Sequence, residues 1–357
     1  MKPGKFIRRI LIVFLAFMAT IGVFNLIVNP YDEFSWQFFL PGTPPVRTYK
    51  KEVINKTEKP IDYVVLGSSR LQSLDPENVF PGTNSINIIT FNPFMDDIYA
   101  MWKYLLEKKG PPRGAVLGLQ VAFFHPGLYD SAVLFGDKDL SKHIKWTPRE
   151  RVGYNWLRFR RLFRLYAVRH SIKVLTNFAR GRSYFLKFDD RGIAYVPAFP
   201  VSAGPLDKPP PDVMARRYKG KQARLIYIRE VQYRNFTHLD KNRLRLLDEI
   251  LSDFEKYNVE AYVYTTPIHP DMIEISQRIT PFNQWQKLMR EMCKKHNVFF
   301  VNLTNASTIE WLPLWEFVDS GHLSEKAIKV MEIKLRDKYF KIGATSPENR
   351  KNREGDK

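Results

Sequence analysis

The residues best suited to do chemistry together are a serine that follows a short apolar run and a histidine near the end of the chain. Ser69 closes Gly67-Ser-Ser69, directly after the β-branched run Tyr63-Val-Val-Leu66. His322 lies three residues after Asp319. A serine hydroxyl becomes a nucleophile when a base takes its proton, and an imidazole, with an unperturbed pKa of about 6.5, does this near neutral pH. Asp319 can orient that base by accepting from its ring N–H, so the three residues indicate acyl-transfer chemistry.

Each of these segments also has an ordinary structural explanation. Gly and Ser are common in strand-to-helix turns, where Ser68 or Ser69 can cap the next helix. Asp319 precedes a predicted helix, as many capping residues do, and a surface histidine such as His322 is often simply solvated. Their joint placement favours chemistry, because one segment follows the first predicted strand and the other follows the last. The carboxyl ends of parallel strands meet at one edge of a sheet, where such sheets bind ligands.

The elements that must position these residues alternate along the chain. Short apolar runs separated by segments with helical spacing are typical of parallel βαβ units. We predict an α/β fold with a three-layer, flavodoxin-like parallel sheet and flanking helices, within a domain over 61–342. Residues 125–235 interrupt the alternation and are predicted to be a helical, basic insertion that caps or flanks the sheet edge. The predicted strands are Tyr63–Leu66, Ser85–Ile89, Gly114–Gln120, Val259–Tyr264 and Val298–Val301, and the predicted helices are Met95–Lys108, 239–257, 272–295 and 323–340.

The N-terminus has the pattern of a membrane anchor. Ile10 to Val28 is uncharged and apolar and is long enough as a helix to cross a bilayer. Ala16-Phe-Met-Ala19 lacks the spacing of a cleavage site, so we predict an uncleaved signal-anchor rather than a cleaved peptide or a buried helix. The basic residues that precede the span are predicted to hold 1–9 in the cytoplasm and to send the rest to the periplasmic or extracellular side. These residues are Lys2, Lys5, Arg8 and Arg9.

The segments on either side of the predicted domain carry little apolar pattern. Residues 29–60 contain several turn-forming prolines and one glycine and are predicted to be a juxtamembrane linker. The charged tail 343–357 is predicted to be disordered. The single cysteine, Cys293, lies in a helical pattern and cannot form an internal disulfide, so we predict a core thiol.

The chain has 56 Lys and Arg against 37 Asp and Glu, a formal net charge of +19. The predicted topology places most of this charge outside the cytoplasm, which argues against nucleic acid as a partner. Ten of the basic residues and one acid lie between Arg149 and Arg182, interleaved with aromatic and aliphatic residues. Such a helical segment suits the surface of an anionic membrane or an anionic envelope polymer. The alternative is that its apolar face packs on the domain and its arginines are solvated.

The chain resembles a known family at both ends and in between. Val64-Val-Leu-Gly-Ser-Ser-Arg70 and Asp319-Ser-Gly-His322 are similar to the first and last conserved blocks of the SGNH/GDSL hydrolase superfamily. Asn29-Pro-Tyr-Asp-Glu-Phe34, Ala115-Val-Leu-Gly-Leu-Gln120 and Thr265-Thr-Pro-Ile-His-Pro270 resemble its membrane-anchored branch in bacterial envelopes, the relatives of DltD and of alginate O-acetylation proteins.

The resemblance implies roles for individual residues. Ser69 stands at the nucleophile position, His322 at that of the base, and Asp319 at that of its orienting carboxylate. It implies an extracytoplasmic, inner-membrane-anchored serine esterase or O-acyltransferase that acts on acyl (acetyl) esters of an envelope polysaccharide, without a cofactor. It also implies a multi-pass O-acyltransferase as a partner.

The predicted oxyanion hole departs from the family pattern. Asn92 stands where a glycine is expected, and Gln120, in Gly118-Leu-Gln120, replaces the asparagine of a Gly-x-Asn. Glutamine still donates through its amide, from a side chain one methylene longer. This change supports the alternative that the protein is a non-catalytic accessory or scaffold of an envelope acylation system with a vestigial triad.

Two further residues are candidates for substrate contact. Arg70 follows Ser69 and can hold an anionic group or pair with a carboxylate. His269 follows the fourth predicted strand and either lines the same cleft or is a polar loop residue flanked by prolines. The remaining histidines lack the spacing of a metal site, and we predict neither a metal nor a cofactor. They are His125, His143, His170, His238 and His296.

Overall fold

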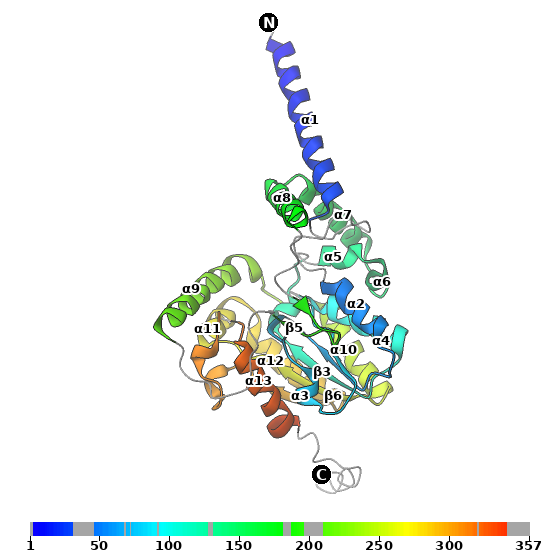
Figure 1. The fold of residues 1–357 in the computed structure, drawn as a ribbon, viewed down its shortest axis with the longest axis vertical. Helices are drawn as coiled ribbons and strands as arrows, with labels where there is room; N and C mark the ends of the chain where they lie inside the picture. The colour runs from blue at the N-terminus through cyan, green and yellow to red at the C-terminus, as the bar shows by residue number, and fades with distance from the viewer. Residues whose placement is uncertain are drawn as a thin grey trace. The chain divides into compact units, whose positions relative to one another are not determined.

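A parallel five-stranded sheet, in the order β2-β1-β3-β6-β7, organises the larger part of the chain (Figure 1). The computed structural model describes residues 3–30, 46–67, 69–71, 73–90, 93–127, 131–180, 187–195, 210–319 and 321–340. The chain order reverses between β1 and β3, which defines the switch point at which such sheets bind ligands. The strands are β1 (Tyr63–Leu66), β2 (Ser85–Asn87), β3 (Gly114–Leu119), β6 (Glu260–Thr265) and β7 (Phe299–Asn302).

Both faces of the sheet are covered. One set of alternating strand residues, which includes Tyr63, Val65 and Val116, shares a core with the helices α3 (Pro76–Val79) and α13 (Glu325–Lys334). The residues that point the other way, such as Val64 and Ala115, have no exposed surface. Helix α10 (Lys241–Lys256) contacts both α4 (Met95–Lys109) and α12 (Phe282–Lys295). Every residue of β1 and β3 is buried, which explains why these two parallel strands are continuous apolar runs in the sequence. The predicted α/β class with a parallel sheet is confirmed.

Some helices of this unit begin at residues whose side chains cap them. Asp240 caps α10 by accepting from the Arg243 N–H, and Ser324 caps α13 by accepting from the Ala327 N–H. The helices are α2 (Val46–Lys56), α3 (Pro76–Val79), α4 (Met95–Lys109), α9 (Pro211–Tyr227), α10 (Lys241–Lys256), α11 (Pro270–Ile279), α12 (Phe282–Lys295) and α13 (Glu325–Lys334). Short 3-10 turns span Ser69–Leu71, Val121–Phe124, Ala306–Thr308 and Leu314–Glu316, and π-helical turns span Ile228–Gln232 and Leu335–Phe340. A two-stranded hairpin pairs β4 (Lys187–Phe188) with β5 (Ala194–Tyr195).

The structure differs from the predicted elements in two places. The single helix predicted over 272–295 is two helices, α11 and α12, with Thr280 extended between them and Pro281 before α12. Proline has no backbone N–H and disfavours helical backbone in the residue before it, which accounts for the break. Buried Cys293 lies in α12, as predicted.

The second difference lies in the segment predicted to be a linker, where Val46–Lys56 forms α2. Val53, Ile54 and Lys50 of α2 are buried. The Lys50 ammonium donates to the backbone oxygens of Asn87, at 2.8 Å, and of Gly192. Burial lowers the pKa of Lys50 to about 7, and nearby Asp189 acts against that shift. Residues 31–45 and the tail 343–357, with its predicted disorder, lie outside the described residues.

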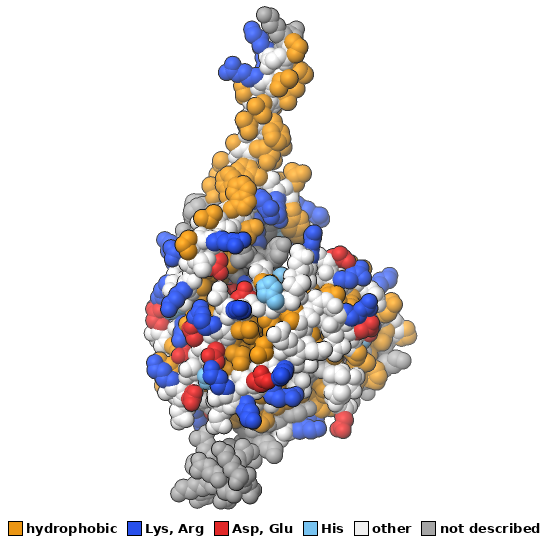
Figure 2. Space-filling view, turned by 180° about the vertical axis from the view of Figure 1, so that it is seen from behind, with side chains coloured by type: hydrophobic (Ala, Val, Ile, Leu, Met, Phe, Trp, Pro, Cys, Tyr) orange, Lys and Arg blue, Asp and Glu red, His pale blue; other side chains and the backbone are white. Residues whose placement is uncertain are grey.

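A second compact unit contains α1 (Pro3–Val28) and the helices α5 (Ser131–Gly136), α6 (Lys138–Ser141), α7 (Pro148–Leu162) and α8 (Leu165–Ala179). Helix α1 is long and apolar enough to span a membrane or to be a signal sequence. Hydrophobic side chains cover its length, and basic residues lie near its N-terminal end (Figure 2). Helix α7 starts with a capping box, in which Thr147 and Glu150 bond each other's backbone N–H groups.

Candidate active site

Ser69 lies at the carboxyl end of β1, immediately after a tight turn. The turn contains Gly67, whose φ of +148° is one that other residues rarely adopt. A Cβ at Gly67 would also lie 2.9 Å from the carbonyl oxygen of Gly118 on β3. Glycine is therefore required for the close approach of the two strand ends. The chain then enters the 3-10 turn that begins at Ser69 and leaves its side chain half-buried.

His322 lies on a loop that is closed at its base. Phe317 and Leu323 form an antiparallel bridge, and the Val318 N–H donates to the carbonyl of His322 at 2.9 Å. The Ser324 N–H donates to the carbonyl of Glu316 at 2.8 Å, just before α13 begins. These backbone bonds pair the two ends of the segment that carries Asp319 and His322.

The structure brings Ser69, His322 and Asp319 together, although Ser69 and His322 are 253 positions apart in the chain. The Ser69 Oγ lies 3.1 Å from the His322 Nε2, and the His322 Nδ1 lies 2.9 Å from the Asp319 Oδ2. The His322 and Asp319 side chains keep 26% and 23% of their surface exposed. The imidazole and the carboxylate are therefore accessible to solvent, and the order hydroxyl, imidazole, carboxylate is the one that nucleophilic catalysis requires.

Asp319 is held as an anion. Its Oδ1 accepts from the backbone N–H groups of Gly321, at 2.7 Å, and of His322, at 2.8 Å. Burial by itself would raise the pKa of Asp319, but the hydrogen bonds and the charge of His322 lower it to about 2. An ionised Asp319 favours the tautomer of His322 that carries its proton on Nδ1, which leaves Nε2 free to accept from Ser69.

Arg70, the residue after Ser69, is buried and contacts two other segments, the one that follows β6 and the histidine loop. Its guanidinium donates to the Thr266 Oγ1 at 3.1 Å and lies 3.7 Å from the Met272 sulfur, both after β6. The same guanidinium packs against Gly321 in the histidine loop. Burial lowers the pKa of Arg70 to about 10. Thr266 and Met272 were not predicted from the sequence, because nothing local marks their contact with a residue about two hundred positions earlier.

Gln120 lies at the end of the strand next to Ser69. Leu66 of β1 pairs with Leu117 of β3, and Ser69 and Gln120 each follow three residues later. The register thus puts the two at neighbouring strand ends, and Gln120 is 7% exposed. Asn92, the other expected contributor to the oxyanion hole, lies outside the described residues. Its role stays a prediction.

His269 caps α11 and lines a hollow beside the histidine loop. Its Nδ1 accepts from the Asp271 N–H at 3.3 Å, and its ring meets that of Phe317 edge-on at 5.7 Å. Burial lowers the pKa of His269. The hollow has a volume of about 330 Å³, and its other lining residues are Met214, Arg217, Tyr218, Lys221, Leu314 and Trp315.

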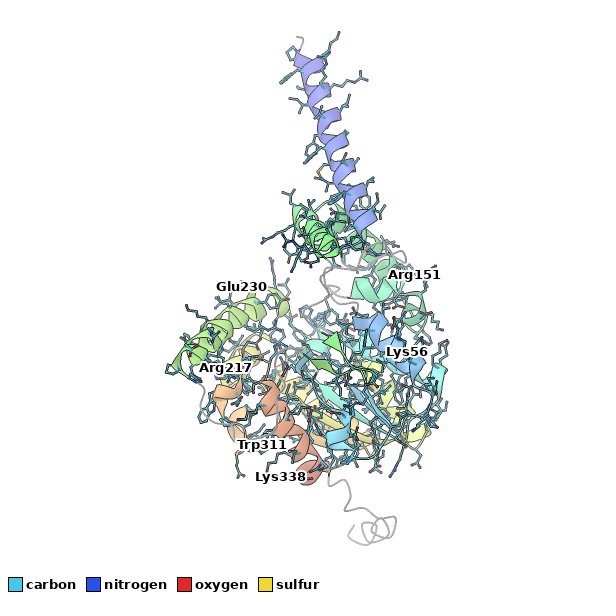
Figure 3. The ribbon with its side chains drawn as sticks, in the orientation of Figure 1. Lys56, Arg151, Arg217, Glu230, Trp311 and Lys338 are labelled. Atoms are coloured by element: carbon cyan, nitrogen blue, oxygen red, sulfur yellow. The ribbon has the colours of Figure 1, made fainter. Side chains whose placement is uncertain are left out.

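Helix α9 lines one side of this hollow, and Figure 3 labels Arg217 on this helix. Arg217 donates to the carbonyl of Trp315 and lies 3.7 Å from the Glu316 carboxylate. Lys221 lies 2.9 Å from the Asp271 carboxylate. These ion pairs join α9 to the loop before Asp319 and to the start of α11. The sequence carried no motif for them, since basic residues are frequent throughout this region.

No family model matches this chain, and no curated protein matches it. A solved structure described as that of a candidate platelet activating factor from Streptococcus pneumonia aligns with 82% of this chain and 90% of its own, at 10% sequence identity and a TM-score of 0.39.

Proposed function

We propose that the chain is a serine esterase or acyltransferase of the SGNH type. The observation that carries the proposal is the continuous contact from the Ser69 Oγ through His322 to Asp319, at 3.1 and 2.9 Å. Ser69 attacks the ester carbonyl carbon while His322 Nε2 takes the hydroxyl proton. The tetrahedral intermediate then collapses, and His322 returns the proton to the departing alkoxide. His322 next deprotonates water or an acceptor hydroxyl, whose oxygen takes the acyl group from Ser69, and His322 returns that proton to the departing Ser69 Oγ.

The substrate in this proposal is an acyl ester, in particular an acetyl ester, of an envelope glycan. Helix α1 would anchor the chain in the cell membrane, with the sheet unit on the outer side. Support comes from the apolar length of α1, from the basic residues before it, and from the motifs that resemble membrane-anchored envelope proteins. A multi-pass O-acyltransferase that delivers or receives the acyl group is part of the same proposal.

A test needs only the purified full chain in detergent. We expect it to hydrolyse p-nitrophenyl acetate and to gain one fluorophosphonate adduct, which peptide mass mapping should locate at Ser69. An adduct on another residue would contradict the assigned nucleophile. A fully folded chain without adduct or turnover would favour the non-catalytic scaffold.

Gln120 is the proposed side-chain donor to the oxyanion. Replacement of Gln120 by alanine should lower kcat by roughly 10²-fold to 10³-fold, because one preorganised donor to the developing charge is lost. Gln120→Glu should be similarly impaired, since it keeps the length of the side chain but not the amide N–H. The measurement is steady-state ester hydrolysis. A kcat within about twofold of the wild type in Gln120→Ala would remove Gln120 from the oxyanion hole.

A further inference from the structure

Helices α7 and α8 are joined to the last turns of α1 by buried polar contacts. Asn25 of α1 has no exposed surface, and its amide donates to the carbonyl of Leu162 at 2.6 Å. The same side chain accepts from the Ser171 hydroxyl at 2.7 Å. One turn earlier, Gly22 leaves room for the ring of Phe163, which a Cβ would approach to 2.6 Å. The α7–α8 pair is therefore built onto the C-terminal end of α1.

The other side of this pair exposes large apolar residues. On α8, Ala167, Ser171 and Val174 are buried, whereas Leu165 and Ile172 are 74% and 55% exposed. Helix α7 exposes three more large side chains at helical spacing, and two of them stack with ring centroids 5.9 Å apart. These residues are Val152, Trp156 and Phe159. Exposed apolar side chains clustered on one pair of helices indicate a surface that contacts a membrane or another molecule.

Basic residues line a hollow on the same face of α8. Its volume is about 580 Å³, and no acidic side chain lines it. Arg169, Lys173 and Arg180 recur along this face at helical spacing and are exposed. The pKa of His170 in the same hollow is lowered by burial and by the charges of Lys173 and Arg169. The hollow is thus electropositive, with room for an anionic group.

We infer that the α7–α8 pair lies in the headgroup layer of the bilayer that α1 spans, with the phosphate of an anionic lipid in the α8 hollow. This inference rests on the membrane anchoring proposed above. If α1 crosses the bilayer, its C-terminal turns lie at the outer surface, and Asn25 holds the pair at that depth. Apolar side chains then enter the acyl boundary while arginine and lysine meet the phosphates, the usual arrangement of interfacial helices.

The experiment uses the full chain with its only thiol removed by Cys293→Ala, reconstituted in phosphatidylcholine vesicles with and without phosphatidylglycerol. A fluorophore at Ile172→Cys reports on the α8 surface, and one at Ser252→Cys, exposed on α10, is the matched control. We expect doxyl-labelled lipid to quench the Ile172 probe, more strongly with phosphatidylglycerol and less at high salt. The Ser252 probe should stay unquenched.

Three charges on α8 are then removed together by Arg169→Gln, Lys173→Gln and Arg180→Gln. This change should lower quenching at Ile172 to the level seen in phosphatidylcholine alone. The matched control removes three exposed charges from α12 (Lys287→Gln, Arg290→Gln, Lys294→Gln) and should leave quenching unchanged. A loss of quenching in the control as well would show only general charge attraction and overturn the α8 site.

Alkaline carbonate extraction tests the membrane anchoring by α1 separately from the headgroup site on α8. Release of the unmodified chain from the vesicles would refute the anchoring itself. A chain that stays embedded, with an Ile172 probe that lipid does not quench or quenches equally in both mixtures, would overturn the headgroup site and leave the anchoring intact.

Discussion

Ser69→Ala should lower kcat for ester hydrolysis by roughly 10³-fold to 10⁶-fold, close to the background rate. The Ser69 Oγ lies 3.1 Å from the His322 Nε2, and alanine leaves that imidazole without a hydroxyl to deprotonate. The substitution removes one atom from a half-buried side chain, so the fold should persist. Steady-state kinetics and intact-mass detection of the acyl-enzyme measure the effect.

The matched control is Ser252→Ala, which removes a hydroxyl from the exposed face of α10. It should keep wild-type kcat and wild-type labelling by a fluorophosphonate. If Ser69→Ala were still labelled, or if it kept more than about a tenth of the wild-type kcat, Ser69 could not be the nucleophile.

Asp319→Asn should lower kcat by roughly 10⁴-fold and also lower the midpoint of thermal unfolding modestly, because the stabilising contribution of the ionised carboxylate is lost. One carboxylate oxygen accepts from two backbone N–H groups, and the other faces the His322 Nδ1 at 2.9 Å. An asparagine has a single acceptor oxygen. If it keeps the backbone bonds, its NH₂ faces the ring and favours the tautomer with a proton on Nε2, which cannot accept from Ser69. Kinetics with the ester and the midpoint of thermal unfolding test both parts.

The pH dependence gives a second readout for Asp319. Because its pKa is lowered to about 2 in the folded chain, Asp319 is ionised throughout the range in which the protein can be assayed. Its stabilising contribution is present above the unfolded value of 3.8 and is lost as the pH falls through about 2. The kcat of Asp319→Asn should therefore be lowered at every pH between 5 and 9. The pH at which the variant is most active should not shift.

A control carboxylate with similar bonding is Asp189, which accepts from the N–H groups of Arg191 and Ile193 in the β4–β5 hairpin. Asp189→Asn should leave kcat unchanged. Equal losses in both variants would mean that Asp319 acts only on loop structure. Full activity in Asp319→Asn would show that His322 needs no orienting carboxylate.

The local features of this protein could be predicted from neighbouring residues. The β-branched run before Gly67 predicted β1, and the alternation of such runs with helical spacing predicted the parallel sheet. The break between α11 and α12 was missed, although Pro281 marks it, because the apolar spacing continues across it. Helix α2 was missed because the prolines and the glycine before Val46 led us to predict a linker for the whole segment.

What the sequence by itself determined is therefore the set of elements, the apolar helix α1 and the residue types at the ends of the strands. These features depend on interactions between residues that are close in the chain. Such interactions require apolar residues at regular spacing, which the sequence shows directly. Only the tertiary structure decided that Ser69 meets His322, that Arg70 lies against Thr266 and Gly321, and that Asn25 holds α7 and α8. The reason is physical. Contacts between residues a hundred or more positions apart depend on strand order and on how whole helices pack, and no short stretch of sequence encodes either.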